Sequence, residues 1–108
     1  MLNKFVSLYV PSTNKGKTIT RRVHNAYVRE IAEQFSTHFG GCTCTQGVGY
    51  WKSESSGLVA ERVTIVKSYY SIESDIALSL AQTLANSIKT RLGQEAVSLE
   101  TESGIDFV

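Results

Sequence analysis

The chain has 108 residues, of which 42% are hydrophobic and 19% are charged, and its formal net charge is +1. These values are typical of one globular domain over residues 1–108, and they exclude a disordered or fibrous protein. The near-neutral charge gives no reason to expect a nucleic-acid partner. No stretch approaches the roughly 20 apolar residues of a membrane-spanning helix, and the first residues lack the apolar run of a secretory signal. We therefore expect a soluble, cytoplasmic protein without a membrane partner.

The first half of the chain is expected to form a strand, a loop and a helix. Residues 5–10 are almost all apolar, aromatic or β-branched, which indicates a central strand. The polar residues 12–18 indicate a loop. From Thr20, a candidate N-cap, apolar residues recur at steps of three and four, and Gly40 supplies the stop. The pattern predicts a helix of about five turns.

The second half is expected to form a hairpin, a helix and a final strand. Residues 42–51 and 58–69 are two β-rich runs, separated by a polar turn at 53–57. Ser71 is a candidate N-cap for a second helix that ends at Gly93. Its apolar face comprises Ile76, Leu80, Leu84, Ile88 and Leu92, widened by Ala77, Ala81 and Ala85. Residues 96–100 then predict a strand and residues 104–108 a short edge strand.

The order β, α, β, β, α, β predicts an α+β fold with both helices on one face of an antiparallel sheet, a ferredoxin-like sandwich. Right-handed crossovers would place the first strand beside the third, and the fourth outside the first. The third strand carries apolar residues on both faces, although one helix layer covers only one face. We therefore expect the open face to pack against another copy of the chain, which predicts a homo-oligomer. Gly47 and Gly49 interrupt the second strand and indicate a bulge or a close approach to its backbone.

Basic residues gather around the predicted start of the first helix. The segment 11–18 ends in Gly-Lys-Thr, as a phosphate-binding P-loop does, but Pro11 stands where that motif needs its first glycine. A weaker hypothesis is that the positive end of the helix and the nearby cations bind an anionic group. The cations are Lys15, Lys17, Arg21 and Arg22. The alternative is a solvated basic loop without a specific role.

No set of residues has the signature of a catalytic or metal site. Cys42 and Cys44 stand two apart on a strand, which suits free buried thiols rather than a disulfide. With only His38 nearby, they are too few for structural zinc, so we predict no metal and no cofactor. The neighbours Glu61 and Arg62 point to opposite faces of their strand. A charge on the inner face needs a partner, which predicts an ion pair within or between subunits, or else an acid–base role for one of the two.

Three motifs resemble a family of small bacterial proteins known only as a domain of unknown function. They are the Gly-Val-Gly-Tyr-Trp strand end at 47–51, the Gly-x-x-x-Glu-Arg hairpin at 57–62 and the Arg-Leu-Gly-Gln-Glu-Ala-Val turn at 91–97. The resemblance covers residues 40–107, and the first helix departs from it at His24, Tyr27 and Val28. It implies no established activity. It implies a shared structural or functional constellation of Trp51, Glu61, Arg62, Gly93, Gln94 and Glu95.

The leading functional hypothesis is a self-associating, non-enzymatic module that binds or senses an anionic small molecule such as a nucleotide. An alternative is a small cofactor-independent enzyme of the dimeric ferredoxin-like type, with polar groups in a pocket between sheet and helices. The polar groups for that alternative are one or more of Tyr50, Glu61, Arg62 or His38. A third possibility is a protein that blocks a partner by adding its edge strand, which needs an exposed strand and no pocket. The candidate pocket or interface residues are Tyr50, Trp51, Glu61, Arg62 and Gln94.

Overall fold

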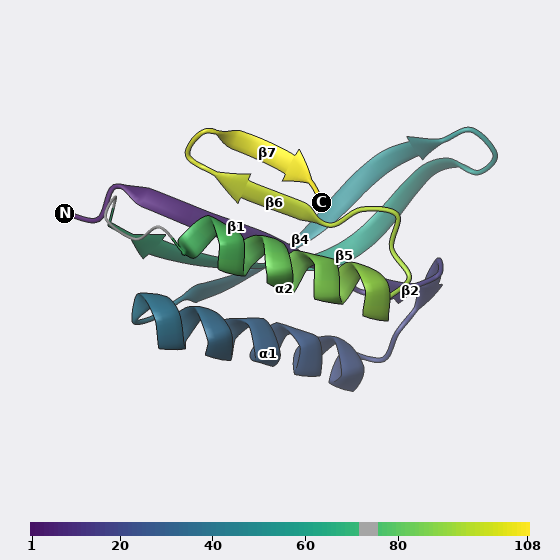
Figure 1. Ribbon diagram of the computed structural model, residues 1–108. Coiled ribbons are helices and arrows are strands. Elements are labelled where there is room, and N and C mark those ends of the chain that lie inside the picture. The colour runs from purple at the N-terminus through teal and green to yellow at the C-terminus, as the bar shows by residue number, and fades with distance from the viewer. Residues whose placement is uncertain (72–75) are drawn as a thin grey trace.

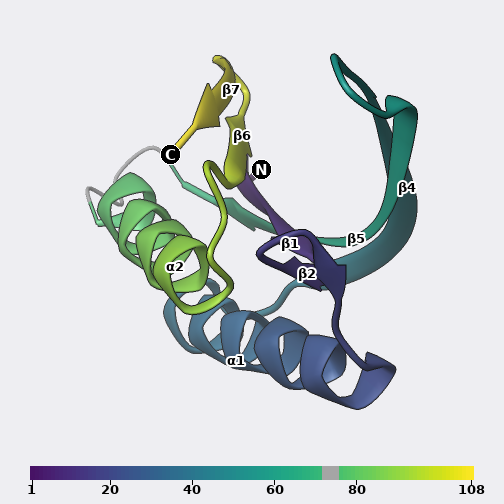
Figure 2. The same ribbon diagram turned by 90° about the vertical axis from the view of Figure 1, so that its right-hand side faces the viewer.

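The computed structural model describes residues 1–71 and 76–108. Its main sheet has five antiparallel strands in the order β4-β5-β1-β6-β7. These strands are β1 (Lys4–Pro11), β4 (Thr43–Ser53), β5 (Gly57–Tyr70), β6 (Ser98–Thr101) and β7 (Gly104–Phe107). The helices α1 (Arg21–Phe39) and α2 (Ala77–Arg91) lie on the same face of the sheet, as Figure 1 and Figure 2 show. No helix in the described part of the chain is long and apolar enough to cross a membrane.

The neighbour order of the four main strands predicted from the sequence agrees with the structure. The first strand, β1, lies in the centre between β5 and β6, and β4 pairs only with β5. The C-terminal strand β7 pairs with β6 and forms one edge of the sheet, as predicted. The other edge is β4. The fold is therefore a two-layer α+β arrangement with one sheet face covered by helices.

The hydrophobic core lies between the helices and the centre of the sheet. Alternate residues of β1 point to the helices and are fully buried, and Val66 of β5 and Leu99 of β6 join them. From the helices, the largest buried side chains are Phe35, Ile31, Ile88 and Leu92. The hydrophobic burial of these side chains fixes which face of β1 turns inward, and the alternation leaves Tyr9 on the other face.

The boundaries of α1 follow the signals that predicted them. The Thr20 hydroxyl accepts a hydrogen bond from the Val23 amide at 3.2 Å, which is a side-chain N-cap. At the other end Gly40 adopts a left-handed conformation with φ 91°, and its amide donates to the Ser36 carbonyl. Both predicted ends of this helix are confirmed.

The second helix differs from its prediction at the start and on its inner face. It begins at Ala77, where Ile76 at the N-cap makes no side-chain capping bond. The residues that directly follow the predicted cap Ser71, 72–75, lie outside the described residues. The core-facing stripe is centred on Ala77, Ala81 and Ala85 and ends in Ile88 and Leu92, whereas Ile76 is exposed. The alanines bring the helix close to β1 because they add little bulk.

The segment 12–18 forms a hairpin rather than an irregular loop. The strands β2 (Thr13–Asn14) and β3 (Lys17–Thr18) pair across the turn residues Lys15 and Gly16, whose φ angles are 51° and 80°. Positive φ at both central residues is the pattern of a type I′ turn. The Lys15 amide donates to the Leu92 carbonyl at 3.3 Å, which ties the hairpin tip to the end of α2.

The hairpin of β4 and β5 projects beyond the helices (Figure 1). Its register runs unbroken from Thr43 opposite Lys67 to Ser53 opposite Gly57. The bulge predicted from Gly47 and Gly49 is therefore absent. These glycines instead open space on the face that the helices leave bare.

Candidate functional site

The helix-free face of the sheet forms an open pocket, which we call the concave-face pocket. Its volume is about 420 Å³, within the range of small-molecule sites. Figure 2 shows the cause of the concavity: β4 and β5 curl up on one side of β1, and β6 and β7 rise on the other. Four of the five candidate residues line this pocket, namely Tyr50, Trp51, Glu61 and Gln94.

Two glycines form part of the pocket wall. Gly47 lies opposite Val63 and Gly49 opposite Glu61, and both glycines line the pocket. An added Cβ at either position would make only an ordinary contact at 3.8 Å, and neither has a positive φ. The backbone therefore does not require glycine there. Because glycine has no side chain, Gly47 and Gly49 leave free space beside Trp51 on the same face of β4. A flat ligand could approach the sheet backbone there.

Glu61 is held in the pocket by hydrogen bonds to the small hairpin. Its Oε1 accepts from the Ser12 amide at 3.2 Å and from the Thr13 hydroxyl at 2.7 Å. The Gln94 side-chain amide donates to the Thr13 carbonyl at 2.8 Å and to the Leu92 carbonyl at 3.1 Å. The second oxygen of Glu61, Oε2, has no protein donor within the described residues. Glu61 therefore presents an oriented carboxylate oxygen that a ligand can contact.

Tyr9 lines the same pocket, and its hydroxyl proton is already used in a hydrogen bond to Glu100. Its hydroxyl donates to Glu100 Oε1 at 2.8 Å. Burial of the ring raises the pKa of Tyr9, and the hydrogen bond and negative charge of Glu100 raise it further. At neutral pH this group is a phenol that can accept a hydrogen bond from a ligand, not a phenolate base. No Lys, Arg or His side chain lines the concave-face pocket within the described residues.

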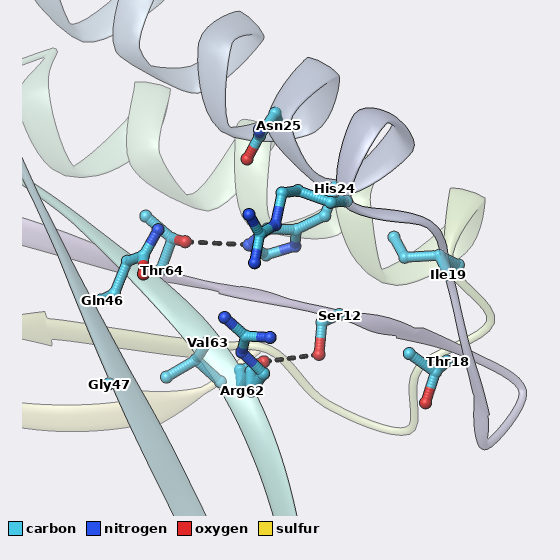
Figure 3. Close-up of a pocket in the computed structure, with 11 residues that line it drawn as sticks. Ser12, Thr18, Ile19, His24, Asn25, Gln46, Gly47, Arg62, Val63 and Thr64 are labelled. Atoms are coloured by element: carbon cyan, nitrogen blue, oxygen red, sulfur yellow. Dashed lines mark hydrogen bonds between the residues drawn. The ribbon is translucent and has the colours of Figure 1, made fainter.

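A second, smaller cavity of about 100 Å³ lies on the opposite face of β4 and β5, which we call the helix-side pocket. Its wall comes from the start of α1, from Ser12 and Thr18, and from β4 and β5. Figure 3 shows Arg62 directed into this space, below the His24 ring. Of the four cations predicted to bind an anion, only Arg21 lines it. Lys15, Lys17 and Arg22 are exposed elsewhere.

The structure places the polar groups proposed for an enzyme in different parts of the molecule. Tyr50, Glu61, Arg62 and His38 do not meet between sheet and helices: Tyr50 and Glu61 line the concave-face pocket, and Arg62 lines the helix-side pocket. His38 lies exposed near the end of α1, with Nδ1 against the Gln34 carbonyl. Neither Glu61 nor Arg62 forms an ion pair within the described chain, so the intramolecular version of that prediction is wrong.

The cysteines are free, and one of them is not buried. Cys42 is half-buried against α1, with its thiol 3.7 Å from the Ala32 carbonyl, whereas Cys44 is exposed. The prediction of two buried thiols is therefore wrong for Cys44. Within residues 1–71 and 76–108, no three His, Cys, Asp or Glu side chains gather in a way that would hold a metal ion.

Sequence reasoning missed several lining residues. Tyr9 and Phe107 belong to strands distant in the sequence, and Thr64 meets His24 only because α1 packs on β5. The one local signal was alternation: Tyr9 follows inward-facing Leu8 and so had to face away from the core. Nothing local indicated that this face would curve into a pocket.

The fold defined by this sheet and helix layer is similar to that of solved structures. The chain is similar to a phage SAM lyase in complex with S-methyl-5′-thioadenosine, with TM-score 0.67 and 16% sequence identity over 97% of this chain and 88% of that chain. It is likewise similar to a phage SAM lyase in the apo state, with TM-score 0.66 and 15% identity over 98% of this chain and 88% of the other. At this identity the likeness shows a shared fold. No family model and no curated protein matches the sequence, so the resemblance to a bacterial family stays a prediction.

Proposed function

We propose that this protein binds a nucleoside-type small molecule in the concave-face pocket. The observation that carries the proposal is the pocket itself: aromatic side chains and two glycines beside the oriented carboxylate of Glu61, without a basic group in its lining. Aromatic faces suit a purine ring, because stacking on a base needs a flat apolar surface. The similar phage protein was solved with a thioether nucleoside, S-methyl-5′-thioadenosine, which supports this ligand class.

The charge of the pocket selects among nucleoside-type ligands. The sequence analysis favoured an anionic ligand such as a nucleotide. In the concave-face pocket, however, Glu61 and the nearby Glu100 would repel a phosphate. A neutral or positively charged nucleoside is better matched. We therefore propose to test two ligands first: S-adenosylmethionine, whose sulfonium is a cation, and the neutral thioether S-methyl-5′-thioadenosine.

The first experiment compares these two ligands by calorimetric titration. We expect both to bind, and Trp51→Ala to weaken both because it removes a stacking surface. Glu61→Gln keeps the shape and the Oε1 acceptor but removes the charge. It should weaken the sulfonium ligand about tenfold and leave the thioether almost unchanged, because only the sulfonium carries a charge for the carboxylate to attract.

Glu54→Gln is the matched control, since Glu54 is an exposed carboxylate at the tip of the same hairpin and lines neither pocket. It should behave as the unaltered protein does. The proposal fails if neither ligand binds saturably, or if Trp51→Ala and Glu61→Gln bind both ligands as Glu54→Gln does.

A second candidate function is enzymatic, a small cofactor-independent enzyme acting on the same ligand. The observation that favours it is the unpaired Oε2 of Glu61 in the pocket, in a fold shared with a protein described as a SAM lyase. Incubation with S-adenosylmethionine, followed by chromatography for S-methyl-5′-thioadenosine, separates the two candidates. Product that accumulates with the unaltered protein and not with Glu61→Gln supports an enzyme, whereas binding without product supports a binding module.

Two further features belong with this proposal. We propose that the fold is a ferredoxin-like sandwich with β7 added at one edge; the strand order and the two helices on one face support this. We also retain self-association through the open face. The partner-blocking alternative required a molecule without a pocket, so the concave-face pocket weighs against it.

A further inference from the structure

We propose that the helix-side pocket is a separate binding site for a compact oxyanion, that is, a carboxylate or phosphate group of a small molecule. This site differs from the nucleoside site in position and in charge. Although Gly47 and Val63 contribute to both cavities, the two pockets open on opposite faces of β4 and β5. A ligand in one pocket does not occupy the other.

The first argument is the pair of unpartnered guanidinium groups. Arg21 begins α1 and Arg62 lies on β5, and both line the cavity. The described residues form only two ion pairs within 4.0 Å, Lys4 with Glu102 and Arg91 with Glu30. No Asp or Glu lines the helix-side pocket within the described residues. Two arginines from different elements therefore converge on a space that holds no protein carboxylate, which is the arrangement that recognises an oxyanion.

The second argument is the set of polar groups between the arginines. His24 is fixed at both ring nitrogens: Nδ1 lies 3.0 Å from the Pro11 carbonyl, and Nε2 lies 2.8 Å from the Thr64 hydroxyl. Because a carbonyl only accepts, Nδ1 carries a proton, and the ring acts as a rigid wall (Figure 3). The side-chain amides of Asn25 and Gln46 make no hydrogen bond within the described chain and line the same cavity. They supply neutral donors to complement the guanidinium groups.

The third argument is size. A cavity of about 100 Å³ is well below the roughly 300 Å³ at which pockets begin to take drug-sized ligands. It admits one small anionic group rather than a whole nucleotide. Any larger molecule would have to place its carboxylate or phosphate in the cavity and leave the rest outside.

The experiment is an NMR titration of the full chain with inorganic phosphate and, separately, with acetate. We expect saturable shifts of backbone amides at Gln46 and Thr64 with at least one of the two anions, and the tighter one identifies the class. Arg62→Gln should weaken this binding about tenfold, because it removes a charge-assisted pair of hydrogen bonds.

Arg22→Gln is the matched control, because it removes the same charge one residue from Arg21 without touching the cavity. It should leave anion affinity within about twofold of the unaltered protein. The inference is overturned if neither anion gives saturable shifts, or if Arg22→Gln weakens binding as much as Arg62→Gln. Arg62→Gln should bind nucleosides in the concave-face pocket normally, so this test and that of the nucleoside site fail independently. Unfolding curves of each variant verify that it is folded.

Discussion

At the scale of single residues, Gly93 gives a physical reason for one position of the Arg-x-Gly-Gln-Glu turn. Its φ is 55°, and an added Cβ would lie 2.7 Å from Lys15 Cγ and 3.2 Å from Asn14 Oδ1. The glycine therefore serves both the left-handed turn after α2 and the close packing of the β2–β3 hairpin on that turn. Gln94 next to it donates to Thr13 in the same hairpin. Adjacent residues of one motif thus position the segment that holds Glu61.

Replacing Gly93 by Ala should destabilise the protein by about 2 kcal/mol, from left-handed strain plus the contact with Lys15. In a Lys15→Ala background the same replacement should cost only about 1 kcal/mol, because the clashing Cγ is gone and the backbone strain remains. Urea unfolding of the four proteins in this double-mutant cycle measures the difference. Equal costs in the two backgrounds would mean that Lys15 does not pack on Gly93.

At the scale of elements, the two helices differ in how far the sequence predicted them. The start and the end of α1 are encoded locally, by the Thr20 hydroxyl and the freedom of Gly40, so the sequence predicted both ends. The hydrophobic period predicts the apolar side of α2 but places the larger residues at the centre of the buried face. In the structure the centre is the alanine row, and Leu80 and Leu84 lie half-buried beside it. The distance between helix and sheet decides this, and periodicity does not encode that distance.

Ala81→Leu should therefore destabilise the protein by about 1–3 kcal/mol, although leucine is a good helix former. Ala81 is fully buried in the core, so the larger side chain has no space. The control is Gln82→Leu, one position along on the exposed side of the helix, which should change the free energy of unfolding little. Thermal unfolding of both variants is the measurement. A neutral Ala81→Leu would show that α2 lies farther from the sheet than described.

At the scale of the whole molecule, the β4–β5 hairpin projects away from the helices (Figure 1). Beyond the helices it exposes large apolar side chains on both faces, with Leu58 67%, Tyr50 65% and Trp51 48% accessible. Closer to the centre, the open face is less apolar than expected, because Lys67 lies over the Phe5 ring at 4.0 Å. The apolar surface that the open face offers to a second copy comprises Trp51 of the hairpin, Tyr69 of β5, and Ile105 and Phe107 of β7.

We expect the protein to sediment as an oligomer at tens of micromolar, with Phe107 on the open face in the contact between copies. Phe107→Lys should shift it toward the monomer, because a charge would be buried at the interface. Leu78→Lys alters an exposed leucine on α2, in the helix layer, and should leave the assembly intact. Sedimentation equilibrium measures both. A monomeric unaltered protein contradicts the expectation of self-association.

The candidate sites show the limit of sequence reasoning most clearly. The sequence singled out Trp51, Glu61 and Gln94, which line one pocket, and Arg21 and Arg62, which line another. The sequence analysis grouped Arg62 with the residues of the concave-face pocket, but Arg62 lines the helix-side pocket. Alternation along β5 shows that Glu61 and Arg62 point to opposite faces of the sheet, but it does not show which of the two faces the helices. Sequence reasoning also linked Lys15 to Arg21 by proximity in the chain, whereas the hairpin turns Lys15 toward the end of α2.

By itself, the sequence determined the order of the two helices and the strands of the main sheet, the neighbour order of four strands and both ends of α1. These features depend on local chemistry: hydrophobic period, caps and turns, together with the handedness of crossovers. Only the tertiary structure decided that the open face curls into a pocket and that Arg62 and Glu61 serve different cavities. Curvature, and contacts between residues as distant as Tyr9 and Glu100, arise from the packing of the whole sheet, which no short stretch of sequence specifies.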